Sequence, residues 1–357
     1  GEKLHIKDAN AYFRATEEGI KASKKAKKPF YLNVNISDPH KPFYGMNQRQ
    51  ELVDDPHKPS RYFTPDEVPI PGFLYDDPKI RLELAHYYMS VRRADDCVGE
   101  ILRALDESGE SENTVVMFLS DHGMALPWAK TALYHHSTWT PWIVRWPGKI
   151  APGTIDDTHM ISAVDLTPTL MDVAGIEATP PFDGRSFFPI LEGKTQQDRK
   201  HIFKEYNENS GAGRHPIRGV QDKQFLYLFN PWSDGENKFK TATTGTLSYV
   251  QMQERAKYDP VMAERLRFFD HRSIEELYDV ENDPDCLNNL VNHPDYRTQL
   301  DDLRSALTEW MINTDDHALV AMQNRKQPEV MYQYVADLQT EANARHEARR
   351  KTRQAAR

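Results

Sequence analysis

Residues 113–138 read "NTVVMFLSDHGMALPWAKTALYHHST", and this segment is the most informative about the fold. Its first part, 113–119, is dominated by apolar and β-branched residues and predicts a buried strand. The strand ends at Asp121 and His122, and Gly123 follows. A strand that only has to reach the surface needs a single polar or flexible residue. Two potential metal ligands beside a glycine therefore indicate a site at this strand end.

The segments around this strand predict an α/β fold. Apolar residues recur at steps of three and four over residues 81–107, as is typical of an amphipathic helix. The runs "KPFYLNVNI" (28–36) and "TPWIVRWPG" (140–148) are further strand candidates. A helix that leads into a buried strand favours crossover connections. We therefore expect a mostly parallel sheet flanked by helices.

The pattern changes near residue 198. Three short strand-like runs separated by turns follow, "KHIFKEYN", "HPIRGVQ" and "QFLYLFN", and they predict a small antiparallel sheet. We expect a large α/β domain over 1–198, a small C-terminal α+β domain over 199–318 and a helical, basic tail over 319–357. The arginines at the end of that tail favour a solvated helix over a docking element.

Composition narrows the class of protein. Hydrophobic residues make up 39% and charged residues 28% of the 357 positions, which is typical of a globular protein. No apolar run approaches the roughly 18 residues of a membrane span, and a net charge of −9 argues against a nucleic-acid partner. Cys97 and Cys286 form neither a disulfide framework nor a metal-type spacing, so they leave the compartment open.

Four polar residues are expected to share one pocket. Ligands of parallel α/β sheets bind beyond the carboxyl ends of the strands. Asp121 and His122 stand at such an end, and His40 follows the strand candidate at 28–36. The chain after His122 can bring Lys130 back to the same end of the sheet. Each has a structural alternative when taken alone: an aspartate after a strand is most often a turn or cap residue, and a histidine between prolines is most often structural.

The chain resembles the sulfatases of the alkaline-phosphatase-like superfamily over nearly its whole length. "SDPHKP" resembles the family's Pro-His-x-Pro loop, and "YYMSVRRADDCVGEILRALDESGESENTVVMFLSDHG" resembles its long helix and metal-binding strand. "TPWIVRWPG", "VDLTPTLMDVAGI", "FDGRSFFPILEG" and "ELYDVENDPDCLNNL" follow in the family's order. The resemblance implies an alkaline-phosphatase-like sheet, incomplete at its N-terminal side, and a hydrolase that removes sulfate from sulfated sugars.

The resemblance also implies roles for the four residues. Asp121 and His122 occupy the metal-ligand positions, Lys130 the position of the basic residue that contacts the sulfate, and His40 that of the histidine beside the leaving group. Sulfatases bind calcium at this place, so we expect one calcium ion. His122 leaves a softer metal open, because calcium prefers oxygen ligands.

The substrate is expected to be a sulfated carbohydrate. "NISDPHKPF", "HPIRGVQDKQFLYLFNPW" and "SIEELYDVENDP" look most similar to the sulfamidase branch of the family, which implies N-sulfated glucosamine of heparan-type glycans. We expect substrate contacts from Asp38 and, in the segment 206–220, from His215 and Arg218. A surface turn with a solvated arginine is the alternative for that segment.

We expect neither cysteine of this sequence to supply the nucleophile of the family. Sulfatases use a formylglycine made from the first residue of Cys/Ser-x-Pro/Ala-x-Arg, whereas Cys97 is followed by "VGEI" and Cys286 by "LNNL". The family's upstream pair of aspartates is also not found. We therefore expect the C-terminal portion of a sulfatase, inactive by itself.

Two alternatives stay open. A phosphodiesterase or phosphonate hydrolase of the same superfamily would need further histidine ligands, and a non-catalytic relative would bind sulfated sugar without hydrolysing it. The resemblance implies a periplasmic, secreted or lysosome-like location, and the oligomeric state is open.

Overall fold

The computed structural model describes residues 5–177, 179, 182–196, 198–208 and 213–355. The first half of the chain contains α1 (Ala9–Ala26), α2 (Pro78–Glu107), β1 (Val116–Leu119), α3 (His135–Thr138), β2 (Trp142–Arg145), α4 (Leu166–Val173) and α5 (Phe188–Leu191). The second half contains β3 (Ile202–Glu208), β4 (Arg214–Gln221), β5 (Phe225–Phe229), α6 (Leu247–Ala256), α7 (Pro260–His271), β6 (Glu275–Asp279), α8 (Arg297–Asn313), α9 (Leu319–Gln323) and α10 (Pro328–Ala355).

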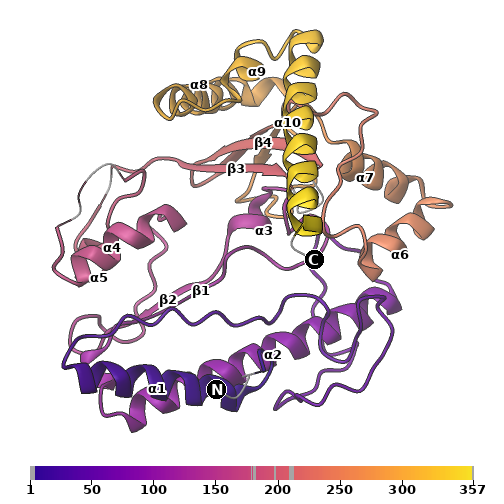
Figure 1. The fold of residues 1–357 in the computed structure, drawn as a ribbon. Helices are drawn as coiled ribbons and strands as arrows, with labels where there is room; N and C mark the ends of the chain where they lie inside the picture. The colour runs from indigo at the N-terminus through magenta and orange to yellow at the C-terminus, as the bar shows by residue number, and fades with distance from the viewer. Residues whose placement is uncertain (1–4, 178, 180–181, 197, 209–212, 356–357) are drawn as a thin grey trace.

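The predicted helix over 81–107 is confirmed as α2, which begins slightly earlier. Asp77 caps it by accepting hydrogen bonds from the backbone N–H groups of Lys79 and Ile80, and Pro78 stands at its first turn, where no N–H is needed. The helix α1 packs along α2 at the base of the molecule (Figure 1). Together they support the polypeptide that leads into β1.

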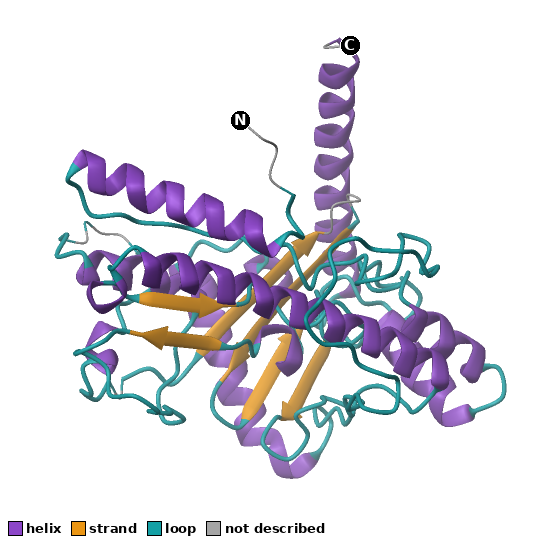
Figure 2. Ribbon diagram, turned by 90° about the horizontal axis from the view of Figure 1, so that it is seen from below, coloured by secondary structure: helices purple, strands orange, loops and turns teal. Residues whose placement is uncertain are grey.

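The small antiparallel sheet predicted after residue 198 is also confirmed. Its strand order is β3-β4-β5-β6, and every neighbouring pair is antiparallel (Figure 2). Alternate residues of β5 point to opposite faces, as the period of two requires. Leu226 and Leu228 lie in one core cluster, and Phe225, Tyr227 and Phe229 lie in the other.

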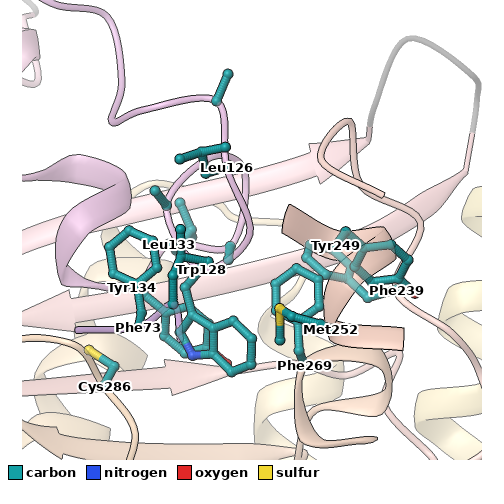
Figure 3. Packing of buried hydrophobic residues seen from close by; sticks show 14 of the residues in the cluster. Phe73, Leu126, Trp128, Leu133, Tyr134, Phe239, Tyr249, Met252, Phe269 and Cys286 are labelled. Carbon is teal, nitrogen blue, oxygen red and sulfur yellow. The ribbon is translucent and has the colours of Figure 1, made fainter. Parts of the chain in front are cut away.

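The first face of this sheet packs against the stretch that opened the sequence. Leu126, Trp128, Leu133 and Tyr134 belong to the same buried cluster as Leu228 (Figure 3). Each large apolar side chain that is fully buried contributes about 1.5–3 kcal/mol to folding. The core thus crosses the expected boundary at residue 198, and the loop after β1 is fixed by the sheet beyond it.

The second face of the sheet is covered by α8, α9 and α10 (Figure 1). Leu303 and Leu307 of α8 and Tyr334 and Leu338 of α10 are buried in this cluster. The helical tail expected over 319–357 is therefore part of the core as far as Ala342. Beyond that residue, the described side chains of α10 are exposed, as a solvated basic helix requires.

The arrangement of the strands differs from the mostly parallel sheet that the sequence predicts. In the described part of the chain, β1 pairs only with β2, and this pair is antiparallel. The run at 28–36 is extended but forms no ladder, and the side chains of Tyr31, Leu32 and Val34 are exposed. High β-propensity needs a hydrogen-bonding neighbour to become a strand, and none of the described residues provides one. None of the described helices combines the length and apolarity that crossing a membrane requires.

Candidate functional site

The glycine after the Asp-His pair allows the loop to close on itself. The backbone N–H of Gly123 donates to the carbonyl of Ser137 at 2.9 Å. A Cβ atom at this position would lie 1.8 Å from the carbonyl oxygen of His136. Any side chain would therefore push the two ends of the loop apart, so the glycine is required by a close approach of two backbones.

The closed loop holds Lys130 in a tightly determined position. Most residues between Ala125 and Tyr134 are buried, and the backbone is left-handed at Trp128, Thr131 and Leu133, with φ of 66°, 71° and 58°. Left-handed conformations are unfavourable for β-branched and bulky residues and persist where the surroundings impose them. Here the surroundings are the aromatic core beneath the loop (Figure 3). Such strain is common at functional sites.

Asp121 and His122 lie side by side at the mouth of the loop. The Nε2 atom of His122 is 3.7 Å from a carboxylate oxygen of Asp121, whose side chain is 86% exposed. The Nδ1 atom of His122 lies 2.7 Å from the carbonyl oxygen of Gly123. Because a carbonyl only accepts, Nδ1 donates this hydrogen bond, and Nε2 lies on the side of the carboxylate. This orientation suits a metal ligand.

Among the described residues, Asp121 and His122 are not joined by further metal ligands. Across the described ranges, no group of three or more His, Cys, Asp or Glu side chains gathers where it could hold an ion. Calcium takes six to eight oxygen ligands, whereas Asp121 supplies one carboxylate and His122 an imidazole. These two residues suit one edge of a metal shell and do not make a calcium site by themselves.

Lys130 presents a cation with no carboxylate partner. Its ammonium forms no hydrogen bond or ion pair in the described part of the chain, although Asp121 is close enough to act on it electrostatically. Burial lowers the pKa of Lys130, and the charge of Asp121 opposes that shift. A half-buried ammonium that no carboxylate contacts directly is costly, and an anionic ligand in direct contact would relieve that cost.

Lys41 is a second cation at the site, and the sequence analysis did not identify it. Its Nζ donates to the carbonyl of Ala242 at 3.1 Å, and the neighbouring Thr241 hydroxyl lies 2.8 Å from that of Thr131. Lys41 and the residue after Lys130 thus contact adjacent positions of one segment. The sequence held one signal for it, its place directly after His40 in "DPHKP".

His40 lies at the edge of this group. Its side chain is exposed, and its Nδ1 lies 2.6 Å from the carbonyl oxygen of Lys41. The loop therefore brings His40 to the site through its neighbour Lys41. The structure shows no direct contact between His40 and Asp121 or Lys130 among the described residues.

Asp38 is bound to basic residues of the protein itself. It accepts a hydrogen bond from Nε of Arg93 at 2.5 Å, and the ammonium of Lys7 also contacts it. Arg93 in turn donates to Asp55 at 2.7 Å. Arg93 and Asp38 are both buried, so this cluster fixes the 38–42 loop on α2 and leaves no free carboxylate for a ligand.

His215 and Arg218 are also held inside the protein. The guanidinium of Arg218 is 1% exposed and pairs with Asp316 at 2.5 Å. The ring of His215 packs edge-on against Trp232 and Phe239, and burial lowers the pKa of His215 to about 4. Neither side chain joins Lys130. Of the segment 206–220, residues 209–212 lie outside the described residues.

The two cysteines are buried inside the protein. Cys97 lies within α2, as expected, and Cys286 lies in the core beneath Tyr134. Burial raises the pKa of each thiol to about 12, so neither is a ready nucleophile at neutral pH.

Two family models match the chain. The sulfatase model covers residues 7–176, and the model for the C-terminal part of N-sulphoglucosamine sulphohydrolase covers residues 121–237. The two ranges overlap on the loop that carries Asp121, His122 and Lys130. The chain belongs to the sulfatase family.

Individual sulfatases agree with this assignment. An ulvan-active sulfatase from Formosa agariphila is 28% identical over 277 residues, which span 77% of this chain and 46% of that protein. The N-sulphoglucosamine sulphohydrolase of Homo sapiens is 28% identical over 315 residues, which span 81% of this chain and 62% of the human protein. An endo-4-O-sulfatase from Bacteroides thetaiotaomicron is 30% identical over 278 residues, which span 74% of this chain and 48% of that protein. The chain thus spans about half to three fifths of the length of these relatives.

Solved structures confirm the sulfatase fold and with it the α/β class. A 2-O GAG sulfatase matches with a TM-score of 0.55 at 17% identity, over 86% of this chain and 64% of that one. A Bacteroides thetaiotaomicron protein from a genetic locus for glycosaminoglycan metabolism matches with a TM-score of 0.59 at 21% identity. The match covers 88% of this chain and 62% of that one.

Proposed function

We propose that this chain supplies the sulfate-recognition side of a sulfatase that hydrolyses sulfate groups on sulfated sugars. The observation that carries the proposal is the Lys130 ammonium, which forms no ion pair with any described residue and stands near Asp121 in a strained, largely buried loop. A sulfate group carries the negative charge that would neutralise this ammonium. The names of the relatives, which include ulvan-active and N-sulphoglucosamine enzymes, support a sulfated carbohydrate as the substrate.

The described residues divide the work of hydrolysis in this proposal. Lys130 would hold the sulfate oxygens and stabilise the charge that develops on them. His40, exposed at the end of its loop, would donate a proton to the leaving group. Asp121 and His122 would hold one edge of a calcium ion, whose charge neutralises the sulfate when bound. No step needs a side chain that the protein already pairs internally.

The proposed substrate is N-sulfated glucosamine. The match of residues 121–237 to the C-terminal model of N-sulphoglucosamine sulphohydrolase supports this choice over other sulfated sugars. A location outside the cytoplasm, in the periplasm, a secreted fraction or a lysosome-like compartment, belongs to the same proposal, because such sugars are extracellular polymers.

The test compares two proteins, the 357-residue chain and a longer version that also contains a formylglycine motif. Sulfate release is measured from N-sulfated and from 6-O-sulfated glucosamine. We expect no release by the 357-residue chain, because neither of its cysteines lies in that motif, and release from the N-sulfated sugar by the longer protein. Release only from the O-sulfated sugar would refute the choice of substrate. Binding without release by the longer protein would identify a non-catalytic relative.

A further inference from the structure

Lys41 and Thr131, the residue after Lys130, come from distant loops and contact the same short segment, residues 241–246. Lys41 donates to the carbonyl of Ala242, and Thr131, next to Lys130, contacts the hydroxyl of Thr241. Neither ammonium forms an ion pair in the part of the chain that the structure describes. The two loops are thus held at one segment, and the charge of Lys130 is close enough to act on Lys41 electrostatically.

The segment that receives them is held rigidly. Its hydroxyl groups bond to one another and to its own backbone, and Thr243 and Thr246 are fully buried. Glu83 of α2 accepts hydrogen bonds from the backbone N–H groups of Leu247 and Ser248, where α6 begins. Ala242 itself is exposed, so the Lys41 ammonium ends at an open surface on a fixed support.

No carboxylate of a described residue forms an ion pair with Lys41. Glu83 is the carboxylate that acts on it electrostatically, but Glu83 is buried and already accepts three hydrogen bonds from Leu247 and Ser248. Burial lowers the pKa of Lys41, and the charge of Lys130 lowers it further. With one hydrogen bond made to Ala242, the ammonium has two N–H groups left for a ligand.

We propose that Lys41 forms a second anion subsite beside Lys130, which binds a second anionic group, a sulfate or a carboxylate, of the same sugar. This inference rests on the proposed function, in which Lys130 binds the sulfate that is removed. Lys41 then sets specificity: it selects sugars that carry two anionic groups over sugars that carry one. A lysine suits this role because its ammonium is a compact charge that accepts either kind of oxyanion.

The experiment measures binding to the 357-residue chain by calorimetry. The three ligands are glucosamine with one sulfate, glucosamine with two sulfates, and a uronic acid with one sulfate and its carboxylate. The variants are Lys41→Gln, which can still donate to Ala242 but has no charge, and Lys41→Arg, which keeps the charge. Lys326→Gln is the matched control, because Lys326 is exposed in the loop between α9 and α10. Lys130→Gln tests the primary sulfate site.

We expect at least one dianionic sugar to bind about tenfold more tightly than the monosulfated one, which corresponds to about 1.4 kcal/mol. Lys41→Gln should abolish this preference and leave the affinity for the monosulfated sugar within about twofold, whereas Lys41→Arg and Lys326→Gln should keep it. The ligand that responds identifies the second group as sulfate or carboxylate. Suppose that binding depends on Lys130, but that the preference for a dianionic sugar is absent or does not depend on Lys41. That result would overturn this inference and leave the proposed function standing. Absence of Lys130-dependent binding would overturn both the inference and the proposed function.

The ratio of the three affinities separates this role from a structural one. If Lys41 only fastens its loop to Ala242, Lys41→Gln lowers the affinity for all three ligands equally, and the preference remains. That result would also contradict the second subsite.

Discussion

Lys130 and Arg218 are both basic residues that sequence reasoning placed at the substrate, yet their surroundings are opposite. The ammonium of Lys130 forms no ion pair with the residues that the structure describes, and its loop is strained around it. The guanidinium of Arg218 is buried, paired with Asp316 and hydrogen-bonded to Asn207. A cation that the protein already neutralises stabilises the fold, whereas a cation left without a partner is available to a ligand. The two residues differ in whether an acidic side chain pairs with them in the folded protein, and the sequence alone does not show such pairing.

The largest expected effect concerns the paired cation. Arg218→Ala leaves Asp316 buried without a counter-charge, so we expect the free energy of unfolding to fall by about 3–5 kcal/mol. Urea unfolding of the 357-residue chain measures it. Arg353→Ala, at an exposed position of α10, is the control and should change it by no more than about 0.5 kcal/mol. Equal effects of the two variants would mean that Arg218 is not structural.

The opposite behaviour is expected of the unpaired cation. Lys130→Gln should leave the free energy of unfolding within about 0.5 kcal/mol, because no ion pair is broken. In a longer protein that contains a formylglycine motif, the same change should lower the rate of sulfate release about 100-fold or more, through lost charge stabilisation. A rate that stays within a few-fold of the unchanged enzyme, measured beside Lys326→Gln, would assign the sulfate contact to another residue.

Acid should weaken the core that supports the site. Burial lowers the pKa of His135 and of His215 to about 4, from an ordinary value of 6.5. The unfolded chain therefore takes up protons below about pH 6.5, while the folded chain does so only near pH 4, and stability is lost as pH falls between these values. We expect the free energy of unfolding to drop by about 2 kcal/mol or more between pH 7 and pH 5.

Two variants attribute this loss to particular histidines. His215→Phe, which keeps an aromatic ring between Trp232 and Phe239, should reduce the pH dependence by about half. His346→Gln, at an exposed position of α10, should leave it as it is. A pH dependence that His215→Phe does not alter would place its origin elsewhere.

The smallest expected effects compare two glycines. Gly123→Ala should destabilise the chain by about 1–3 kcal/mol, because the added Cβ meets the carbonyl oxygen of His136. Gly99→Ala, within α2 and with open space around the added atom, should stabilise it by about 0.5–1 kcal/mol. Thermal unfolding of both variants decides the matter, and a stabilising Gly123→Ala would show that the two ends of the loop are not in close contact.

Local patterns were enough to predict part of this molecule. The helix α2, the antiparallel sheet after residue 198 and the proximity of Asp121, His122 and Lys130 follow from periodicity, turns and a short loop. The strand expected at 28–36 failed because strand formation depends on a neighbour, which its own residues do not encode. Arg218 and Asp38 were assigned to the substrate because their partners, Asp316 and Arg93, lie 98 and 55 residues away.

The contact between Lys41 and Ala242 has a consequence for the order of folding. The two residues are 201 positions apart, so their approach requires closure of a very long loop. Contacts of such high sequence separation form late, after local helices and hairpins. The approach of the Lys41 loop to Ala242 is therefore expected to be among the last events when the chain refolds, well after its helical circular dichroism has recovered. A sulfated sugar that binds only the finished pocket would then stabilise the native state by mass action, and its binding would report completion of the fold.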